Sequence, residues 1–135
     1  MAKDVALFNI LTNNLMSVAR EMSADFLRSA YSVVIREAAD CSTFLADAKG
    51  RILAQPQDQP LHMNSVSRAL TGALSKVDVT NLTEDNAIIL NDPYSGGQHQ
   101  SDIYIFSPIV HNGKLVAFAG TTGHHTQRSQ IGRAS

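Results

Sequence analysis

The chain has 135 residues, of which 44% are hydrophobic and 17% are charged, and its formal net charge at pH 7 is -1. This length suffices for one domain with its own core, and the lack of a basic stripe argues against nucleic acid as a partner. Apolar runs such as Ala87–Leu90 are far too short to cross a bilayer, the start does not resemble a signal peptide, and the single Cys41 favours a reducing cytoplasm.

The first predicted element is helical and runs from Val5 to about Ala39. Ser23 could cap a second helix, so a break there stays open. A helix facing the core is favoured over a coiled coil because the heptad pattern is short. The predicted core face carries apolar residues three or four positions apart, namely Phe8, Leu11, Leu15, Val18, Met22 and Phe26.

Two short apolar runs, 43–47 and 51–54, flank the turn residues Asp47 and Gly50 and predict a β-hairpin. The segment 55–60 contains two prolines and is expected to be a loop. A helix capped by Asn64 or Ser65 is predicted to follow and to end near Val77.

The second half of the chain is predicted to consist mainly of strands. Residues 87–90 are expected to form a short buried strand, and 103–110 and 114–120 a hairpin with a tight turn at 111–113. Pro108 indicates a sheet edge or a bulge. Because most consecutive strands are predicted to pair as hairpins and not through βαβ units, the predicted fold class is α+β. It has N-terminal helices, a mostly antiparallel sheet and one further helix.

Polar side chains suited to a divalent metal gather near the end of the chain. His99 and Asp102 have a His-x-x-Asp spacing, and His124 and His125 follow one hairpin later. Imidazole and carboxylate together suit zinc, manganese or iron, and three ligands leave open positions for water or substrate. Neighbouring residues of a strand point to opposite faces, so only one histidine of the pair is expected to enter the site.

The segment 91–97 is expected to be a loop, and it contains two adjacent glycines. Gly96 and Gly97 let the backbone pass close to a ligand, and free amides there could hold an anion, while the simpler alternative is a tight connection. The segment is not a P-loop, because it lacks a Lys-Ser/Thr ending and a following helix. Asn91 and Asp92 are candidates for a substrate loop, and Asp92 for orienting a ligand histidine.

The other candidate side chains are expected to be structural. Cys41 and Ser42 have no histidine close in sequence, which favours small core residues over nucleophiles. His62 and His111 are expected to be structural or surface residues. The sequence therefore names no catalytic residue.

Seven segments along the chain resemble, in order and spacing, the N-terminal part of the hydantoinase B/oxoprolinase family, which includes acetone carboxylase alpha-type subunits. They cover roughly residues 4–125 and are Leu15–Met22, Ser32–Glu37, Asp40–Ser42, Asp47–Gln55, Pro60–Ser65, Leu90–Asp102 and Gly123–His125. The resemblance implies a single partial domain, 1–135, from a larger subunit.

The resemblance also implies a chemistry. Family members open a cyclic amide such as hydantoin or 5-oxoproline together with an ATP-using partner of the hydantoinase A type, which has an actin-like fold. Related carboxylases hold a divalent metal through a His-x-x-Asp and a later histidine. Carried over, this implies His99, Asp102 and His125 as ligands, with His124 as the alternative for the third, and ATP handled only by the partner.

The tail 126–135 lacks the aspartate and double glycine that the family pattern would place after the His-His pair. A truncated reading frame without independent activity is therefore expected. Two alternatives stay open, namely a non-catalytic module that binds a small molecule or a partner, and a non-functional remnant.

Overall fold

The computed structural model describes residues 1–56, 62 and 64–125. Two N-terminal helices, α1 (Ala2–Ser29) and α2 (Val33–Ala38), precede a five-stranded antiparallel sheet. Its strands are β1 (Cys41–Asp47), β2 (Ile52–Ala54), β3 (Ile88–Leu90), β4 (Asp102–His111) and β5 (Lys114–His124), in the spatial order β2-β1-β5-β4-β3. This confirms the predicted α+β class, with hairpins carrying most of the sheet.

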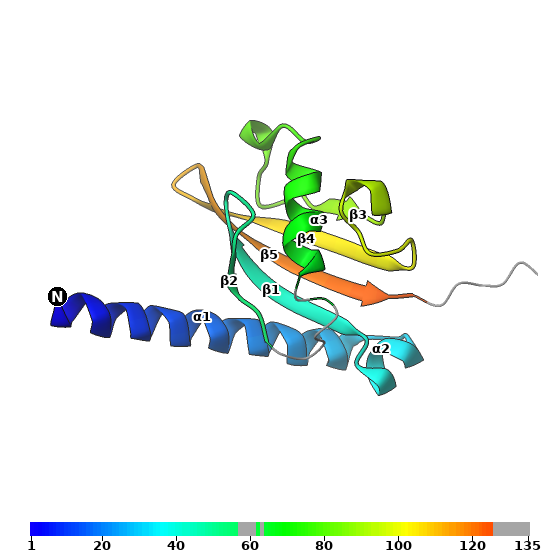
Figure 1. Ribbon diagram of the computed structural model, residues 1–135, viewed down its shortest axis with the longest axis horizontal. Helices are drawn as coiled ribbons and strands as arrows, with labels where there is room; N and C mark the ends of the chain where they lie inside the picture. Colours follow the sequence, from blue (N-terminus) through cyan, green and yellow to red (C-terminus); the bar gives the residue numbers. More distant parts are fainter. Residues whose placement is uncertain (57–61, 63, 126–135) are drawn as a thin grey trace, which may run out of the picture.

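The sheet lies between helices (Figure 1). Helix α3 (Ser65–Leu74) covers one face, and α1 and α2 lie along the other. No helix of the described residues combines the length and apolarity that a membrane span requires.

The main core lies between the sheet and α3. Because side chains alternate along a strand, Phe44, Phe106 and Phe118 share one face and meet Val66 and Leu70 from the helix. A smaller cluster, Ala19, Leu45 and Ala54, forms on the α1 face. Thr43 is fully buried there and donates to the Ala19 carbonyl at 2.8 Å, which fixes α1 on the sheet.

The first helix differs from its prediction in two ways. It continues through Ser23, which is buried, and ends at Ser29, with α2 beginning after Ser32. The predicted core face is also only partly buried, because Phe8 is 67% and Leu11 is 52% exposed. Figure 1 gives the reason, since the N-terminal half of α1 projects past the sheet edge and has no layer above it.

The predicted turns are confirmed. Asp47 accepts hydrogen bonds from the backbone N–H groups of Lys49 and Arg51, and Gly50 takes a φ of 84°. In the second hairpin His111 pairs with Lys114, so Asn112 and Gly113 form a two-residue turn with positive φ at both positions. Of the predicted loop 55–60, residues 57–60 lie outside the described part.

Three details of the later elements were predicted wrongly. Asn64 precedes α3 but its side chain makes no capping hydrogen bond, and the helix ends at Leu74. Strand β3 is an edge strand with Ile89 exposed, not a buried strand. The predicted loop after it contains the short 3₁₀ helix η3 (Pro93–Ser95), and another, η2 (Val79–Asn81), follows α3.

Candidate metal centre

The end of the β4–β5 hairpin opposite its turn brings three candidate ligands together. Asp102 is the first residue of β4, His124 is the last residue of β5, and the two are direct cross-strand partners. His99 joins them through a turn in which the Asp102 backbone N–H donates to the His99 carbonyl at 3.1 Å. The register of the hairpin thus brings together Asp102 and His124, which are more than twenty residues apart in the sequence.

The three side chains lie within a few ångströms of one another. His99 Nε2 lies 3.4 Å from Asp102 Oδ2, and His124 Nδ1 lies 3.2 Å from Asp102 Oδ1. The two imidazole rings meet edge to face, with centroids 5.0 Å apart. One potential ligand atom from each residue can be chosen so that all lie within 4.8 Å of one another. A single cation between them could therefore reach all three.

Asp102 is the unusual member of this group because its carboxylate is only 1% exposed. Among the described residues, its Oδ2 atom has no hydrogen-bond partner. Burying a carboxylate oxygen without a partner costs free energy, so native sites supply a cation or a donor. His99 and His124 are 52% and 30% exposed, so the group opens to solvent on the histidine side. The donor set and this orphaned oxygen fit a divalent ion with open coordination positions.

The two histidines named for the third position lie differently. His124 belongs to the group. The backbone N–H of His125 donates to the Ser101 carbonyl at 2.9 Å, and its exposed side chain stands outside the three grouped residues. The alternation of side chains along an extended chain separates the two.

The glycine-containing loop packs against α3 instead of against the histidines. A Cβ on Gly96 would lie 2.4 Å from the Arg68 carbonyl oxygen, and one on Gly72 would lie 1.8 Å from that of Ser95. Close backbone approach therefore accounts for the glycines Gly72 and Gly96. A Cβ on Gly97 would lie 3.1 Å from the Asp92 carbonyl oxygen, which is a tight but less severe approach, and Asn91 is exposed.

Asp92 has partners within this region. It accepts from the Tyr94 backbone N–H at 3.0 Å and from the Ser95 hydroxyl, and Lys76 Nζ lies 3.7 Å from its carboxylate. The Ser95 hydroxyl, then the Tyr94 amide, hold the pKa of Asp92 below its ordinary value. The described contacts thus tie Asp92 to η3 and Lys76.

A buried pair that the sequence did not indicate lies beside the group. Ser42 Oγ is 2.9 Å from His62 Nδ1, and both side chains are almost fully buried. His62 Nε2 lies 3.9 Å from Asp40 Oδ1, and the Asp40 carbonyl accepts from the His124 backbone N–H. Ser42 and His62 are twenty residues apart, so no local spacing could have revealed the contact. Cys41 is buried, as predicted.

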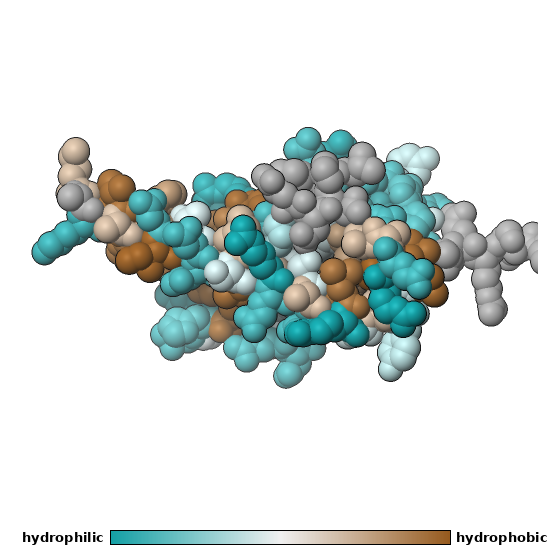
Figure 2. Space-filling view, turned by 90° about the horizontal axis from the view of Figure 1, so that it is seen from below, coloured by the Kyte–Doolittle hydropathy of each residue, from teal (hydrophilic) through white to brown (hydrophobic). Residues whose placement is uncertain are grey.

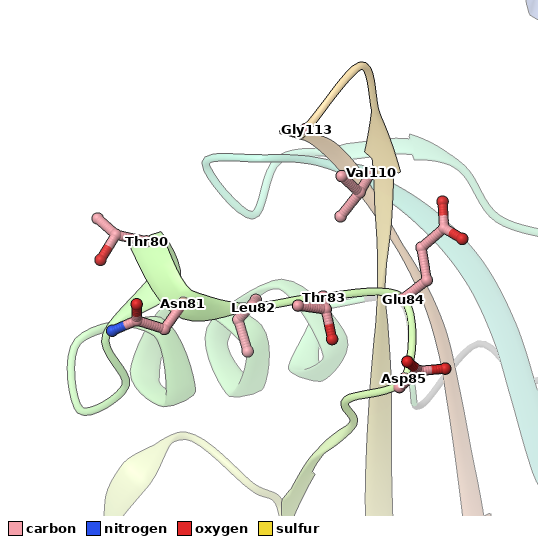
Figure 3. Close-up of a pocket in the computed structure, with 8 residues that line it drawn as sticks. All are labelled: Thr80, Asn81, Leu82, Thr83, Glu84, Asp85, Val110 and Gly113. Atoms are coloured by element: carbon pink, nitrogen blue, oxygen red, sulfur yellow. The ribbon is translucent and has the colours of Figure 1, made fainter.

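A hollow of about 530 Å³ lies away from these residues, between η2 and the turn of the β4–β5 hairpin. Its polar side chains fan out in opposite directions, with Thr80 and Asn81 toward one end and Glu84 and Asp85 toward the other (Figure 3). Because they do not converge, this hollow does not form a catalytic arrangement.

Comparisons with known proteins identify the relatives of this chain. The family model described as Hydantoinase B/oxoprolinase matches residues 4–134, which includes most of the tail that has no counterpart among the motifs. The 5-oxoprolinase 1 of Arabidopsis thaliana is 31% identical over 124 residues, covering 92% of this chain but 10% of the relative. Caprolactamase subunit beta of Pseudomonas jessenii is 28% identical over 117 residues, covering 87% of this chain and 20% of the relative.

Solved structures share the fold. The ATP-dependent caprolactamase from Pseudomonas jessenii superposes with a TM-score of 0.80 at 27% identity, covering 90% of this chain and 21% of that one. A nucleotide-free acetone carboxylase superposes with a TM-score of 0.81 at 20% identity, covering 91% of this chain and 16% of that one. The chain spans about a tenth to a fifth of the length of these relatives. It belongs to the hydantoinase B/oxoprolinase family.

Proposed function

We propose that this chain carries the metal centre of an ATP-coupled hydrolase for cyclic amides, with His99, Asp102 and His124 as the ligands. The observation that carries the proposal is the buried Asp102 carboxylate, which has one oxygen without a partner and an imidazole on either side. His124 here takes the third position, for which the family pattern offered His125 first.

The residues have distinct parts in this proposal. A bound divalent ion would supply Lewis acidity that polarises an amide carbonyl and makes water a better nucleophile. Asp102 supplies the anionic ligand from a rigid, buried strand end, and His124 is held by the sheet register. His99 is half exposed and comes from a turn, so it borders the side from which a substrate can approach.

The proposed reaction and partner rest on the relatives. These relatives include a 5-oxoprolinase, a caprolactamase subunit beta and an ATP-dependent caprolactamase. We therefore propose that the substrate is a small cyclic amide and that ATP is handled by a separate subunit of the hydantoinase A type. The 135-residue chain alone is then expected to bind metal without opening a ring. The buried thiol of Cys41 is compatible with the cytoplasm, where we place the protein.

Metal titration of the purified chain tests the ligand assignment. Mn²⁺ or Zn²⁺ added to metal-free protein should bind with one equivalent by isothermal titration calorimetry. His99→Ala and His124→Ala should each weaken binding by about 100-fold or more, since the loss of an outer hydrogen bond alone costs 10- to 100-fold. His125→Ala is the matched control and should leave the affinity unchanged.

Two results would contradict the assignment. Equal metal content in the unaltered protein and in the His99→Ala and His124→Ala variants would show that neither histidine is a metal ligand. A loss confined to His125→Ala would make His125 the third ligand.

A further inference from the structure

The apolar stripe of α1 extends beyond the sheet that the helix covers. Leu15 and Met22 pack against the small cluster on the α1 face, and Phe8 precedes Leu15 by the same seven-residue step on the same side of the helix. Phe8 is nevertheless 67% exposed, and all of residues 3–14 are exposed. This half of α1 runs past the end of the sheet at which the hairpin turns lie (Figure 1), and apolar surface is visible there (Figure 2). Since an isolated helix is marginal in water, this half gains stability only from a surface that packs on it.

The α1 face of the sheet has an uncovered strip. Thr43 donates to α1, so its cross-strand partner Thr121 lies on the α1 face as well. Ile105 pairs with Thr121 and with Ile89, and Ile109 follows Ile105 by four residues, so the three isoleucines share this face. Helix α1 packs on β1 and β2, and the isoleucines of β3 and β4 are each more than a third exposed.

Small side chains beside this strip let a helix approach the sheet closely. Ala117 of β5 pairs with Ile109, and Ala119 pairs with Ser107, and both alanines are partly exposed. A helix that carries large apolar side chains can therefore pack on β4 and β5 as the second half of α1 packs on β1.

Both surfaces are uncharged. The sequence of α1 has no charged residue from Val5 to Ala19, and the α1-facing residues of β4 from Ile103 to Ile109 are isoleucines and Ser107. A symmetric pair brings the same charges together from both copies, so charged surfaces oppose it and uncharged ones do not. A partner of strong charge would find no group of opposite sign here. These surfaces therefore fit a second copy of the chain, whose net charge of -1 adds little repulsion.

The two surfaces together have the area of a specific interface. The helix contributes Val5, Leu7, Phe8, Ile10 and Leu11, and the strip contributes Ile89, Ile105 and Ile109. At their exposed fractions these side chains present roughly 60–140 Å² each, so one copy offers on the order of 750 Å², close to the 800 Å² per partner of a standard interface.

We propose that two copies of the chain pair about a two-fold axis, with their α1 helices antiparallel and the projecting half of each helix against the uncovered strip of the other copy. Antiparallel helices place the two sheets at opposite ends of the pair, which keeps them apart. The contact lies toward the turn end of the sheet, whereas the candidate metal centre lies at the other end of the β4–β5 hairpin. Pairing therefore leaves the metal centre open and does not depend on the proposed function.

Sedimentation velocity of the 135-residue chain at about 1 to 100 µM tests this pairing. A dissociation constant on the order of 10 µM is expected, at the weak end of the range for an interface of this size. Phe8→Glu and Ile109→Glu should each weaken the dimer by about tenfold or more, because each places an unpaired charge in an apolar contact. Tyr31→Glu is the matched control, since it changes an almost fully exposed aromatic residue beyond the other end of α1, and should leave the constant unchanged.

Cross-linking tests the antiparallel arrangement. Cys41 is the single cysteine of the chain and is buried, so an introduced cysteine is the one that reacts. A short bis-maleimide should join two copies of Ile10→Cys. It should not join two copies of Ser29→Cys, because at 1.5 Å per helical residue these positions lie more than about 50 Å apart in the antiparallel pair.

The pairing is overturned by a monomer at every concentration, by a dimer that either glutamate variant leaves intact, or by cross-linking of Ser29→Cys. Growth into larger species also overturns it, because it would show an open-ended contact in place of a closed pair. Below about 1 µM the chain should be monomeric, so its fold does not require the contact. Circular dichroism and Mn²⁺ stoichiometry are recorded for each variant and should match those of the unaltered chain, because Phe8 and Ile109 lie away from the main core and the metal centre.

Discussion

At the scale of single residues, Gly120 shows how closely the sheet packs in its core. It faces Phe44 on one neighbouring strand and Phe106 on the other, and the two rings meet edge to face with centroids 5.9 Å apart. A Cβ at this position would lie 2.1 Å from Phe44 Cζ. Phe44 is fully buried, so a shift of its ring would have to displace neighbouring side chains of the close-packed core.

Gly120→Ala is therefore expected to destabilise the fold by about 1–3 kcal/mol through overpacking. Urea unfolding followed by circular dichroism measures this change. Gly123→Ala is the matched control on the same strand, because its Cβ would meet the flexible end of Ile35 at 3.1 Å and should cost less. Equal destabilisation by both substitutions would show that strand conformation, not the Phe44 contact, sets the cost.

Individual residues also mark where the sequence stops being informative. The spacing of His99 and Asp102 is local, so the sequence could pair them. The choice between His124 and His125 depends on strand register, because a shift of one residue reverses which side chain faces Asp102. The contact of Ser42 with His62 depends on packing between distant segments, which local patterns do not contain.

At the scale of elements, turn chemistry was predictable and helix ends were not. Asp47 and Gly50 specify the first turn, and Asn112 and Gly113 the second, through their own backbone preferences. Pro108 was also informative, because β3 pairs with β4 only at residues 104–106 and leaves Pro108 at a local edge. The end of α1 depends instead on the sheet that buries Ser23, so a local serine signal was misleading.

The capping carboxylate of η3 predicts how the stability of the fold depends on pH. Its capping carboxylate Asp92 has a folded-state pKa below the ordinary value near 3.8, chiefly because the Ser95 hydroxyl donates to it. A depressed pKa contributes stability above the unfolded pKa, and this contribution is lost as pH falls through the folded value. Stability should therefore decline below about pH 4.

Urea unfolding midpoints at pH 7 and pH 3 measure this effect. Asp92→Asn should lower the unfolding midpoint at pH 7. It should also reduce the difference between the midpoints measured at pH 7 and pH 3. Ser95→Ala removes the principal cause of the pKa shift and should act in the same direction. An unchanged pH dependence in both variants would mean that Asp92 does not contribute to acid sensitivity.

At the scale of the whole molecule, the two faces of the sheet are covered unequally. The α3 face holds the main aromatic core, whereas the α1 residues that pack against the small cluster on the other face begin at Leu15. The projecting half carries several large apolar side chains that are more than half exposed, and Figure 2 shows apolar surface at that end. They are Val5, Leu7, Phe8, Ile10 and Leu11.

This asymmetry predicts that the projecting half of α1 contributes little to the stability of the domain. Deleting residues 2–11 should change the free energy of unfolding by less than about 1 kcal/mol, because these side chains bury little surface, and a helix without packing is marginal in water. Met22→Ala, which removes a contact with the α1-face cluster, should cost about 1–2 kcal/mol. The deletion should also reduce aggregation, measured by light scattering, since it removes exposed apolar surface. A deletion more destabilising than Met22→Ala would show that the projecting half packs against the domain in solution.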